Sequence, residues 1–502
     1  MSKQFYITTA IDYVNGQPHL GHAYEKIITD VIARARQCLG EEVFYLTGLD
    51  EHGQKVQQAA AEAGQEPQVY CDKLAADWQA FVDTLGISNN DFVRTTDERH
   101  KVVVREVLQQ LYDADEFYQD EYAGFYSAKQ EAFLTDRDRN EDGTFDPIYG
   151  EVQELREKNY YFKLGRHQQW LIDHIEANPD FVAPDYRRNE VLGFLKNEKL
   201  EDLCISRPKE RLEWGIPLPF DEDYVTYVWF DALTNYLSIP RARGEEASLW
   251  PADIHVIGKD ILKFHAVYWP IMLKAAGLEL PKQVLVHGWW QMNNQKMAKS
   301  VGNVVDPVKV IDEWGLDAFR YYVVRELAIG PDGNWTDEGF ATRYGAELAN
   351  GLGNLVNRSL SMLNRYREGV MPNPHDELAS EAITTRDKLV EQLKGNELQA
   401  GLMTIWGYIA RLNQYVDQTA PFKMAKDPEQ ADRLGEVLYN LVESCRLLAV
   451  WLQPYLPSTS QRIMEQLNLP VDLVNIAESG WGELEADHKI GEPEGLFPRR
   501  DK

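Results

Sequence analysis

The sequence predicts an α/β protein in which a doubly wound parallel sheet, split by an insertion, is followed by an all-α helical bundle. Strand-like and helix-like runs alternate in the N-terminal part of the chain, and this alternation is interrupted and later resumes. Beyond about residue 345 the periodicity is almost purely helical. Strands and helices in turn are typical of a parallel sheet with crossover helices, whereas helical periodicity alone is typical of a bundle.

Two strand–helix pairs predict the first half of the sheet. QFYITTAI is rich in β-forming residues, and Ala23, Ile27, Val31 and Ala35 follow it at near-helical spacing. EVFYLTGLDEHG indicates a strand that ends in a polar loop, and CDKLAADWQAFVDTLGI indicates the next helix. Both pairs fit one parallel sheet.

The alternation breaks up between residues 115 and 224. This region is aromatic and charged, and it contains the turn-rich stretch TDRDRNEDGTFDP. Strand and helix patterns then return in DIHVIG, ILKFHAVYWPIMLKAAG and QVLVHG. An insertion into one doubly wound domain explains this order better than two separate sheets.

Three apolar stripes predict the helical bundle. They are formed by Leu348, Leu352, Leu355 and Leu363, by Leu402, Ile405, Ile409 and Leu412, and by Leu434, Val437, Leu438 and Leu441, ending before Pro454.

Composition restricts the class of protein. Lys and Arg total 52 and Asp and Glu total 80, and the resulting net charge of −28 argues against a polyanionic partner unless a local patch opposes the mean field. The four cysteines are widely scattered, which favours a reducing compartment. The N-terminus does not resemble a signal peptide, and no apolar run approaches the ~18 residues of a membrane span. We therefore expect a cytoplasmic protein without a membrane partner.

PHLGH places His19, Gly21 and His22 where a strand gives way to a helix. In an open parallel sheet, ligands bind at the carboxyl ends of strands, and helix N-termini there present unpaired N–H groups. Gly21 leaves room for a base or phosphate, and both imidazoles can donate to phosphoryl oxygens. A surface helix start with two incidental histidines explains the motif about equally well.

A second motif, QKMAKSVGNVVD, carries Lys296, Lys299 and Ser300. Two ammonium groups on a loop suit a triphosphate, because they can stabilise the charge that develops as pyrophosphate leaves. Alone, this stretch is better explained as a solvated turn. Its position after PHLGH and after a second strand-like run makes the joint signal strong.

PHLGH resembles the HIGH signature of class I aminoacyl-tRNA synthetases, and KMAKS resembles their KMSKS loop. AIDYVNGQPHLGH, GLDEHG, YVWFDALTNY, GKDILKFH and KIGEPEGLFPR are similar to the methionyl-tRNA synthetase family in particular, over essentially the whole chain. The resemblance implies a Rossmann-type sheet with a connective insertion, an anticodon-binding bundle, and the formation of methionyl-tRNA from L-methionine, ATP with Mg²⁺, and tRNA(Met).

The resemblance also implies domain limits. These are residues 1–114 and 225–295 for the two halves of the catalytic domain, 115–224 for the insertion, 296–345 for the KMSKS loop and stem-contact region, 346–480 for the anticodon-binding bundle, and 481–502 for a tail that packs back on the body.

Site residues follow from the matched motifs. His19, His22, Lys296 and Lys299 would stabilise the transferring phosphoryl group, with Gly21 and Ser300 also at the nucleotide. Asp50 would hold the amino group of the substrate. The residues expected around the substrate side chain are Ile11, Tyr13, Trp229, Leu233, Tyr236, Ile261 and His265. Aromatic walls suit a polarizable thioether, although most aromatic residues are ordinary core.

Two further sets are implied. Asp260, after the strand HVIG, would bind the ribose, and a helix N-cap is the other interpretation. Asn354 and Arg358, four apart on one helix, would read anticodon bases, whereas without the resemblance a solvated polar face is preferred. Phe422 would stack on a base where the family often has tryptophan.

Two departures from the family pattern concern Ala298 and the insertion. Ala298 replaces the usual serine of the loop, so loop closure can differ while both lysines remain. Ser127 and Gln130 stand in GFYSAKQEAF, where zinc-bearing relatives have a cysteine knuckle. We therefore expect a knuckle-like fold without structural zinc.

Three rival functions share part of this evidence. Another class I synthetase, for leucine, isoleucine, valine or cysteine, would share the nucleotide motifs, but the insertion is too small for the usual editing domains and no cysteine set suggests a zinc site. An RNA-binding paralogue without catalysis is disfavoured because both motifs keep their basic residues. A nucleotidyltransferase without tRNA is disfavoured by the long helical region.

The chain ends soon after GLFPR, without room for an appended tRNA-binding domain, so a monomer is expected.

Overall fold

The computed structural model describes residues 3–14, 16–127, 132–134, 138–140, 142–293, 295–297 and 304–500. The chain divides into two compact units, each assembled from distant segments. Unit 1 comprises Met1–Pro18, Phe44–Asp83 and Asn89–His287, and unit 2 comprises His19–Val43, Thr84–Ser88 and Gly288–Lys502.

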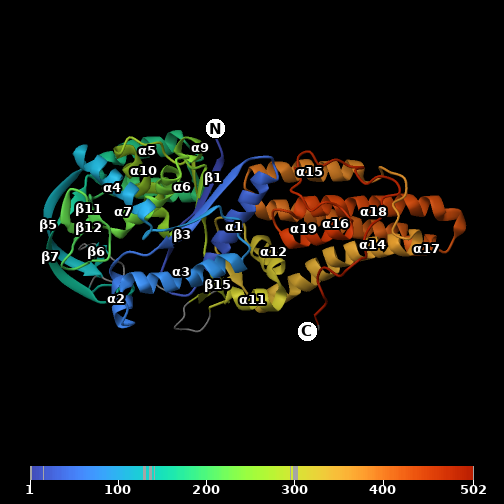
Figure 1. Cartoon of the computed structure of the whole chain (residues 1–502), viewed down its shortest axis with the longest axis horizontal. Coiled ribbons are helices and arrows are strands. Elements are labelled where there is room, and N and C mark those ends of the chain that lie inside the picture. Colours follow the sequence, from blue (N-terminus) through green and yellow to red (C-terminus); the bar gives the residue numbers. More distant parts are fainter. Residues whose placement is uncertain are drawn as a thin grey trace. The chain divides into compact units, whose positions relative to one another are not determined.

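Unit 1 is built on the predicted parallel sheet, which confirms the fold class. Its seven described strands run in the order β2-β3-β1-β13-β14-β8, with β4 paired to β3 (Figure 1). The strands are β1 (Phe5–Thr9), β2 (Asp12–Tyr13), β3 (Val43–Asp50), β4 (Asp91–Arg94), β8 (Val182–Ala183), β13 (Ile254–Gly258) and β14 (Gln283–His287). The chain leaves β1 toward β3 on one side and returns on the other side as β13. The carboxyl ends of β1 and β13 therefore form a topological switch point, where ligands bind in such sheets.

Unit 1 contains nine α-helices among its described residues, and one apolar core joins helices α4 through α10 to the sheet. Tyr6, Leu46, Val93, Ile257 and Val286, each from a different strand, are fully buried in that core. The helices are α2 (Gln54–Glu62), α3 (Pro67–Thr84), α4 (Glu98–Asp113), α5 (Gln168–Ala177), α6 (Asp185–Asn197), α7 (Val228–Leu233), α8 (Asn235–Ala242), α9 (Glu246–Leu249) and α10 (Trp269–Ala275).

The interruption of the sheet is an insertion with two antiparallel sheets. One has the order β6-β5-β7-β9, from β5 (Phe117–Ser127), β6 (Ala132–Leu134), β7 (Val152–Phe162) and β9 (Leu203–Cys204). The other has the order β10-β12-β11, from β10 (Ser206–Pro208), β11 (Pro217–Leu218) and β12 (Asp221–Thr226). The short helix η2 (Pro147–Tyr149) lies between β6 and β7, and η3 (Leu164–His167) leads from β7 into α5.

Unit 2 contains α1 (Leu20–Gln37), a small sheet and the helical bundle. The sheet has the order β16-β15-β17, from β15 (Trp290–Met292), β16 (Gln295–Lys296) and β17 (Gly333–Trp335). The helices that follow are α11 (Pro307–Trp314), α12 (Leu316–Glu326), α13 (Asp337–Arg343), α14 (Asn354–Arg367), α15 (Ala379–Lys394), α16 (Leu398–Thr419), α17 (Pro421–Met424), η8 (Pro428–Gln430), α18 (Ala431–Leu452) and α19 (Pro457–Gln466). The three predicted stripes are buried. Helix α18 is buried nearly all round from Leu434 to Leu452, because it packs against α14, α15, α16 and α19.

Two helical segments depart from regular α geometry. The stretch predicted as one helix after β13 instead contains η4 (Lys259–Ile261) and a π-helical segment, η5 (Phe264–Tyr268), before α10. A second π-helical segment, η7 (Tyr344–Gly353), directly precedes α14. Such widened turns are frequent at functional sites, because they re-aim the side chains beside them. Here they affect His265 and Asn354.

Candidate functional site

The N-terminus of α1 is capped by its own histidines. His19 is the N-cap residue, and its Nδ1 accepts a hydrogen bond from the Gly21 backbone N–H at 3.1 Å. Nδ1 of His22 accepts from the His19 backbone N–H at 3.2 Å, and the two rings stack at a centroid distance of 3.8 Å. Since Nδ1 accepts in both neutral rings, Nε2 carries the proton and is a donor. The start of α1 thus combines two N–H donors with the positive end of a helix dipole, which suits an anion.

The structure gives a reason for glycine at position 21 that the sequence did not suggest. A Cβ at this position would lie 3.0 Å from Cε1 of the His19 ring. The absent side chain therefore leaves space for the imidazole of His19, which folds back over the helix start.

The second motif is described only in part. Lys299 and Ser300 lie outside the described residues, and so does Ala298. Lys296 ends strand β16, which pairs antiparallel with β15, with Lys296 opposite Gln291. Trp290, the first residue of β15, packs edge-on against Tyr24 of α1 at 5.8 Å. The strand pair that carries Lys296 is therefore joined to α1 by a contact two residues beyond His22.

We call the residues expected around the amino acid the amino-acid cluster: Ile11, Tyr13, Asp50, Trp229, Leu233, Tyr236, Ile261 and His265. All eight lie in unit 1. Tyr13 ends β2 and stands opposite Asp50 at the carboxyl end of β3. Lys55 lies over the Tyr13 ring, with Nζ 5.3 Å from its centroid. Tyr13 and Asp50 thus both lie at the carboxyl ends of strands, as the sequence predicted.

Trp229 and His265 belong to the aromatic side of the cluster. Trp229 of α7 stacks face to face on Phe264 at 3.6 Å, and the His265 ring meets it edge-on at 6.5 Å. Leu233, one turn after Trp229, is buried, and Ile11 and Ile261 pack against the same core. Sequence reasoning missed Phe264, although it lies within the quoted motif GKDILKFH.

The His265 ring is held in one neutral form. Its Nδ1–H donates to the Ile261 carbonyl at 3.0 Å, and its Nε2 accepts from the Tyr236 hydroxyl at 2.7 Å. Burial lowers the pKa of His265 to about 4. His255, stacked on Tyr236 at 4.1 Å, is fully buried, and burial holds its pKa well below its ordinary value. The aromatic side of the cluster is therefore uncharged at neutral pH, which suits an uncharged side chain.

Asp260 lies just past the switch-point strand β13. It is exposed within η4, and a Cβ at Gly258 would come within 2.7 Å of its Oδ1. Gly258 therefore allows this carboxylate to turn back over the strand end. That position suits a hydroxyl-bearing ligand, in line with the expected ribose role.

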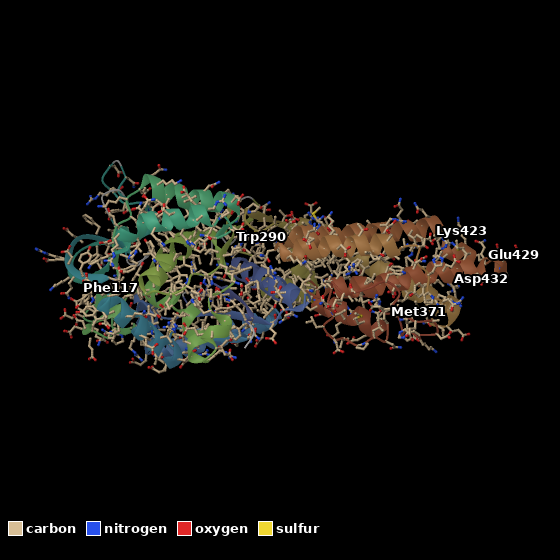
Figure 2. The ribbon with its side chains drawn as sticks, turned by 90° about the horizontal axis from the view of Figure 1, so that it is seen from above. Phe117, Trp290, Met371, Lys423, Glu429 and Asp432 are labelled. Atoms are coloured by element: carbon tan, nitrogen blue, oxygen red, sulfur yellow. The ribbon has the colours of Figure 1, made fainter. Side chains whose placement is uncertain are left out.

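The expected anticodon residues lie on neighbouring elements of the bundle. Asn354 opens α14, and Arg358 one turn later lies 3.8 Å from Asp417 near the end of α16. Ala420 then adopts a left-handed conformation, with φ of 47°, and turns the chain into α17. Phe422 of α17 is 42% exposed. Figure 2 shows Lys423 at the same end of the helical region as Glu429 and Asp432.

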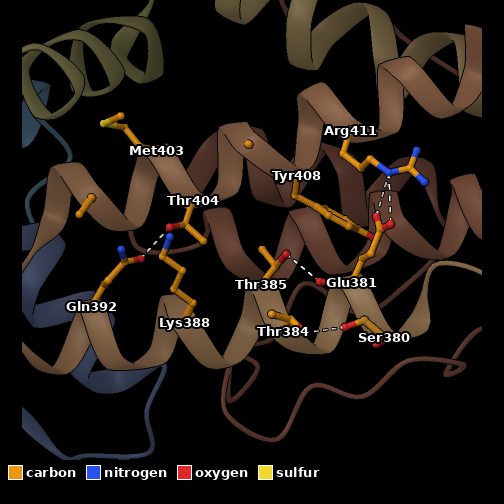
Figure 3. Close-up of a pocket in the computed structure, with 12 residues that line it drawn as sticks. Ser380, Glu381, Thr384, Thr385, Lys388, Gln392, Met403, Thr404, Tyr408 and Arg411 are labelled. Atoms are coloured by element: carbon orange, nitrogen blue, oxygen red, sulfur yellow. Dashed lines mark hydrogen bonds and ion pairs between the residues drawn. The ribbon is translucent and has the colours of Figure 1, made fainter.

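A separate groove of about 630 Å³ lies between α15 and α16 (Figure 3). Its polar groups bond to one another: Arg411 pairs with Glu381 at 3.0 Å, and Thr404 donates to Gln392 at 2.8 Å. None of the sequence-predicted site residues lines it.

The insertion is held without thiolates at the expected knuckle. The Ser127 hydroxyl donates to the Tyr149 carbonyl at 2.5 Å, and the Arg139 guanidinium lies over the Phe125 ring at 4.2 Å. Gln130 lies outside the described residues. Within the described part of the chain, no group of three His, Cys, Asp or Glu side chains is arranged to hold a metal ion. The absence of zinc stays a prediction, and one zinc per chain in elemental analysis would contradict it.

Two family models match the chain. The one described as tRNA synthetases class I (M) matches residues 5–142 and 145–360. The one described as the anticodon binding domain of methionyl tRNA ligase matches residues 373–501.

Curated relatives and solved structures match over nearly the whole of this chain. The methionine–tRNA ligase of Bacillus subtilis is 44% identical, over 99% of this chain and 78% of that protein. That of Enterococcus faecalis is 40% identical, over 99% of this chain and 77% of that protein. The Mycobacterium tuberculosis methionyl-tRNA synthetase in complex with methionyl-adenylate has a TM-score of 0.92 at 38% identity, covering 99% of this chain and 100% of that one. Its apo form has a TM-score of 0.86 at 34% identity, covering 100% of this chain and 99% of that one.

Proposed function

The chain belongs to the class I methionine–tRNA ligase family, and from this premise we infer that it joins L-methionine to tRNA(Met) with ATP as the energy source. In the first step, a carboxylate oxygen of methionine attacks the α-phosphorus of ATP. The new O–P bond forms as the bond to the β-phosphate breaks, and pyrophosphate leaves. In the second step, the terminal ribose hydroxyl of the tRNA, the 2′-OH in class I, attacks the activated carbonyl and AMP leaves.

The observation that carries the phosphoryl step is the paired capping of α1. Backbone N–H groups occupy Nδ1 of both His19 and His22, so Nε2–H of each ring can donate to phosphate oxygens. Lys296 and Lys299 would add positive charge as the pyrophosphate develops, with Gly21 and Ser300 beside the nucleotide. These contacts become stronger in the transition state, so they raise the rate more than the affinity.

The amino-acid cluster would bind methionine. The Asp50 carboxylate would hold the ammonium group. The thioether would contact Trp229, Leu233, Tyr236 and His265, with Ile11, Tyr13 and Ile261 completing the wall. The neutral His265 ring supports this role, because a charged ring would penalise an apolar guest.

Asp260 would accept hydrogen bonds from the ATP ribose. Mg²⁺ would arrive bound to the triphosphate, where it supplies positive charge. The absence of a preformed metal-ligand group among the described residues fits an ion held mainly by phosphate oxygens.

Asn354, Arg358 and Phe422 would recognise the anticodon. The Arg358 side chain is 35% exposed, and its partner Asp417 is 75% exposed, so a base can displace that weak ion pair at small cost. The exposed Phe422 ring offers a stacking surface, and Lys423 supplies a cation beside it in an otherwise acidic protein. Cytoplasmic location and a monomeric state belong to the same proposal.

Amino-acid-dependent exchange of pyrophosphate into ATP, run with each of the twenty amino acids, tests this function. We expect exchange with methionine alone, followed by transfer to tRNA(Met). Exchange with leucine, isoleucine, valine or cysteine would identify another class I synthetase, and tRNA binding without any exchange would identify an inactive paralogue.

A further inference from the structure

Asp231, which the proposed mechanism does not use, bridges two histidines inside unit 1. It lies in α7 and is 1% exposed. Its Oδ2 is 2.6 Å from Nδ1 of His52, and its Oδ1 is 2.7 Å from Nε2 of His100. A carboxylate only accepts hydrogen bonds, so both ring nitrogens donate. His100 in turn contacts the Ser238 hydroxyl at 2.9 Å through Nδ1.

The bridged elements carry the amino-acid cluster. His52 lies two residues after Asp50, in the loop that follows β3. Asp231 lies two residues after Trp229 and two before Leu233. At about 100° per residue, Trp229 and Leu233 share one face of α7, and Asp231 projects from nearly the opposite face. A contact at Asp231 therefore fixes the rotation of α7 and ties it to the Asp50 loop.

Charge makes this contact strong. Burial by itself would raise the pKa of the Asp231 carboxyl, but His52 and His100 outweigh it, and the pKa lies below its ordinary value. The carboxylate therefore stays ionised inside the protein, and its hydrogen bonds are charge-assisted, which makes them shorter and stronger than neutral ones.

The geometry points to Asp231 as a positioning residue for amino-acid recognition. By holding the Asp50 loop through His52, and α4 through His100, it sets the separation between the carboxylate that would bind the ammonium group and the Trp229 face that would bind the side chain. This inference rests on the proposed function.

Asp231→Asn removes the charge with little change in shape and leaves an NH₂ group facing one imidazole donor. In pyrophosphate exchange, we expect KM for methionine to rise roughly tenfold, while KM for ATP changes by less than about twofold. The control is Glu116→Gln. Glu116 is another buried carboxylate of unit 1, bound by Nε2 of His167 at 3.2 Å. The Glu116→Gln substitution should change the free energy of unfolding without raising KM for methionine.

Conservative replacements of the histidines sharpen the test. Asparagine places its amide nitrogen near the position of a histidine Nδ1, and glutamine near that of Nε2. His52 donates from Nδ1, so His52→Asn should keep KM near the wild-type value and His52→Gln should raise it. His100 donates from Nε2, so the opposite result is expected there: His100→Gln should keep KM for methionine near the wild-type value, and His100→Asn should raise it.

The outcomes separate this inference from the proposed function. A wild-type enzyme without methionine-dependent exchange overturns the function. An active wild type with an unchanged methionine KM in Asp231→Asn overturns the positioning role alone, as does a rise in KM equal to that of Glu116→Gln. Should Asp231→Asn fail to fold, the His52 and His100 pairs decide, and equal KM values within each pair overturn the role.

Discussion

The amino-acid cluster of unit 1 and the N-terminus of α1 in unit 2 both depend on histidines, but they use them in opposite ways. In His265 both ring nitrogens are engaged inside the protein, and burial keeps the ring neutral. In His19 and His22 the Nδ1 atoms accept hydrogen bonds from backbone N–H groups at the start of α1, so the proton of each neutral ring is on Nε2. The hydrogen-bond partner of one ring nitrogen thus fixes which nitrogen carries the proton.

This difference divides the labour between the two regions. In the proposed function, the neutral walls of the cluster select the substrate and contribute to affinity. In the same proposal, the start of α1 and the lysines of the second motif act on charge that appears only during reaction, and so contribute to rate.

Lys299→Ala should have the largest effect, and on rate alone. The ammonium would meet charge that develops in the transition state, so we expect adenylate formation to slow by roughly 10³ and methionine Kd to change by less than about twofold. Single-turnover kinetics with equilibrium binding measures both. Parallel losses in rate and affinity would remove Lys299 from this role.

The neutral state of His265 in the amino-acid cluster should be measurable in the pH dependence of the free energy of unfolding. His265 has a pKa of about 4 in the folded chain, against an ordinary value of 6.5. Between these values the unfolded chain binds more protons at His265, so the contribution of His265 to the free energy of unfolding is fully present above pH 6.5 and is lost as pH falls from 6.5 toward 4.

His265→Gln should reduce this loss by about 3 kcal/mol over the same interval. Urea unfolding of both proteins at pH 7, 5.5 and 4.5 measures the difference. If the difference in free energy of unfolding between the two proteins is the same at all three pH values, His265 is not held neutral.

Phe422→Ala should have the smallest effect and should leave both regions untouched. Loss of one stacked base is expected to raise KM for tRNA(Met) roughly tenfold. Pyrophosphate exchange, which does not involve tRNA, should keep its wild-type parameters. Phe422→Trp serves as the matched variant, and it should lower the same KM because indole offers a larger stacking surface.

Local pattern was sufficient to predict much of the fold. The strand β1, the helix α1 and the three bundle stripes follow from hydrophobic spacing, because burial on one face imposes that spacing. The sequence also placed Tyr13 and Asp50 at strand ends, and the structure sets them opposite each other.

Long-range contacts escaped sequence reasoning for a physical reason. Asp231 meets His52 and His100 across 179 and 131 residues of sequence, and no local spacing encodes such a contact. The π-helical segment around His265 also escaped, because the apolar spacing of a widened turn is close to that of an ordinary helix.

One paired measurement tests most directly whether the start of α1 contributes to rate and the amino-acid cluster to affinity. Methionine Kd and the single-turnover rate of adenylate formation should be determined for His22→Ala and for Asp50→Asn. We expect His22→Ala to slow the reaction roughly 10²-fold with methionine Kd near the wild-type value, and Asp50→Asn to weaken methionine binding roughly 10²-fold. A His22→Ala enzyme that loses methionine affinity while its rate is unchanged would contradict this expectation.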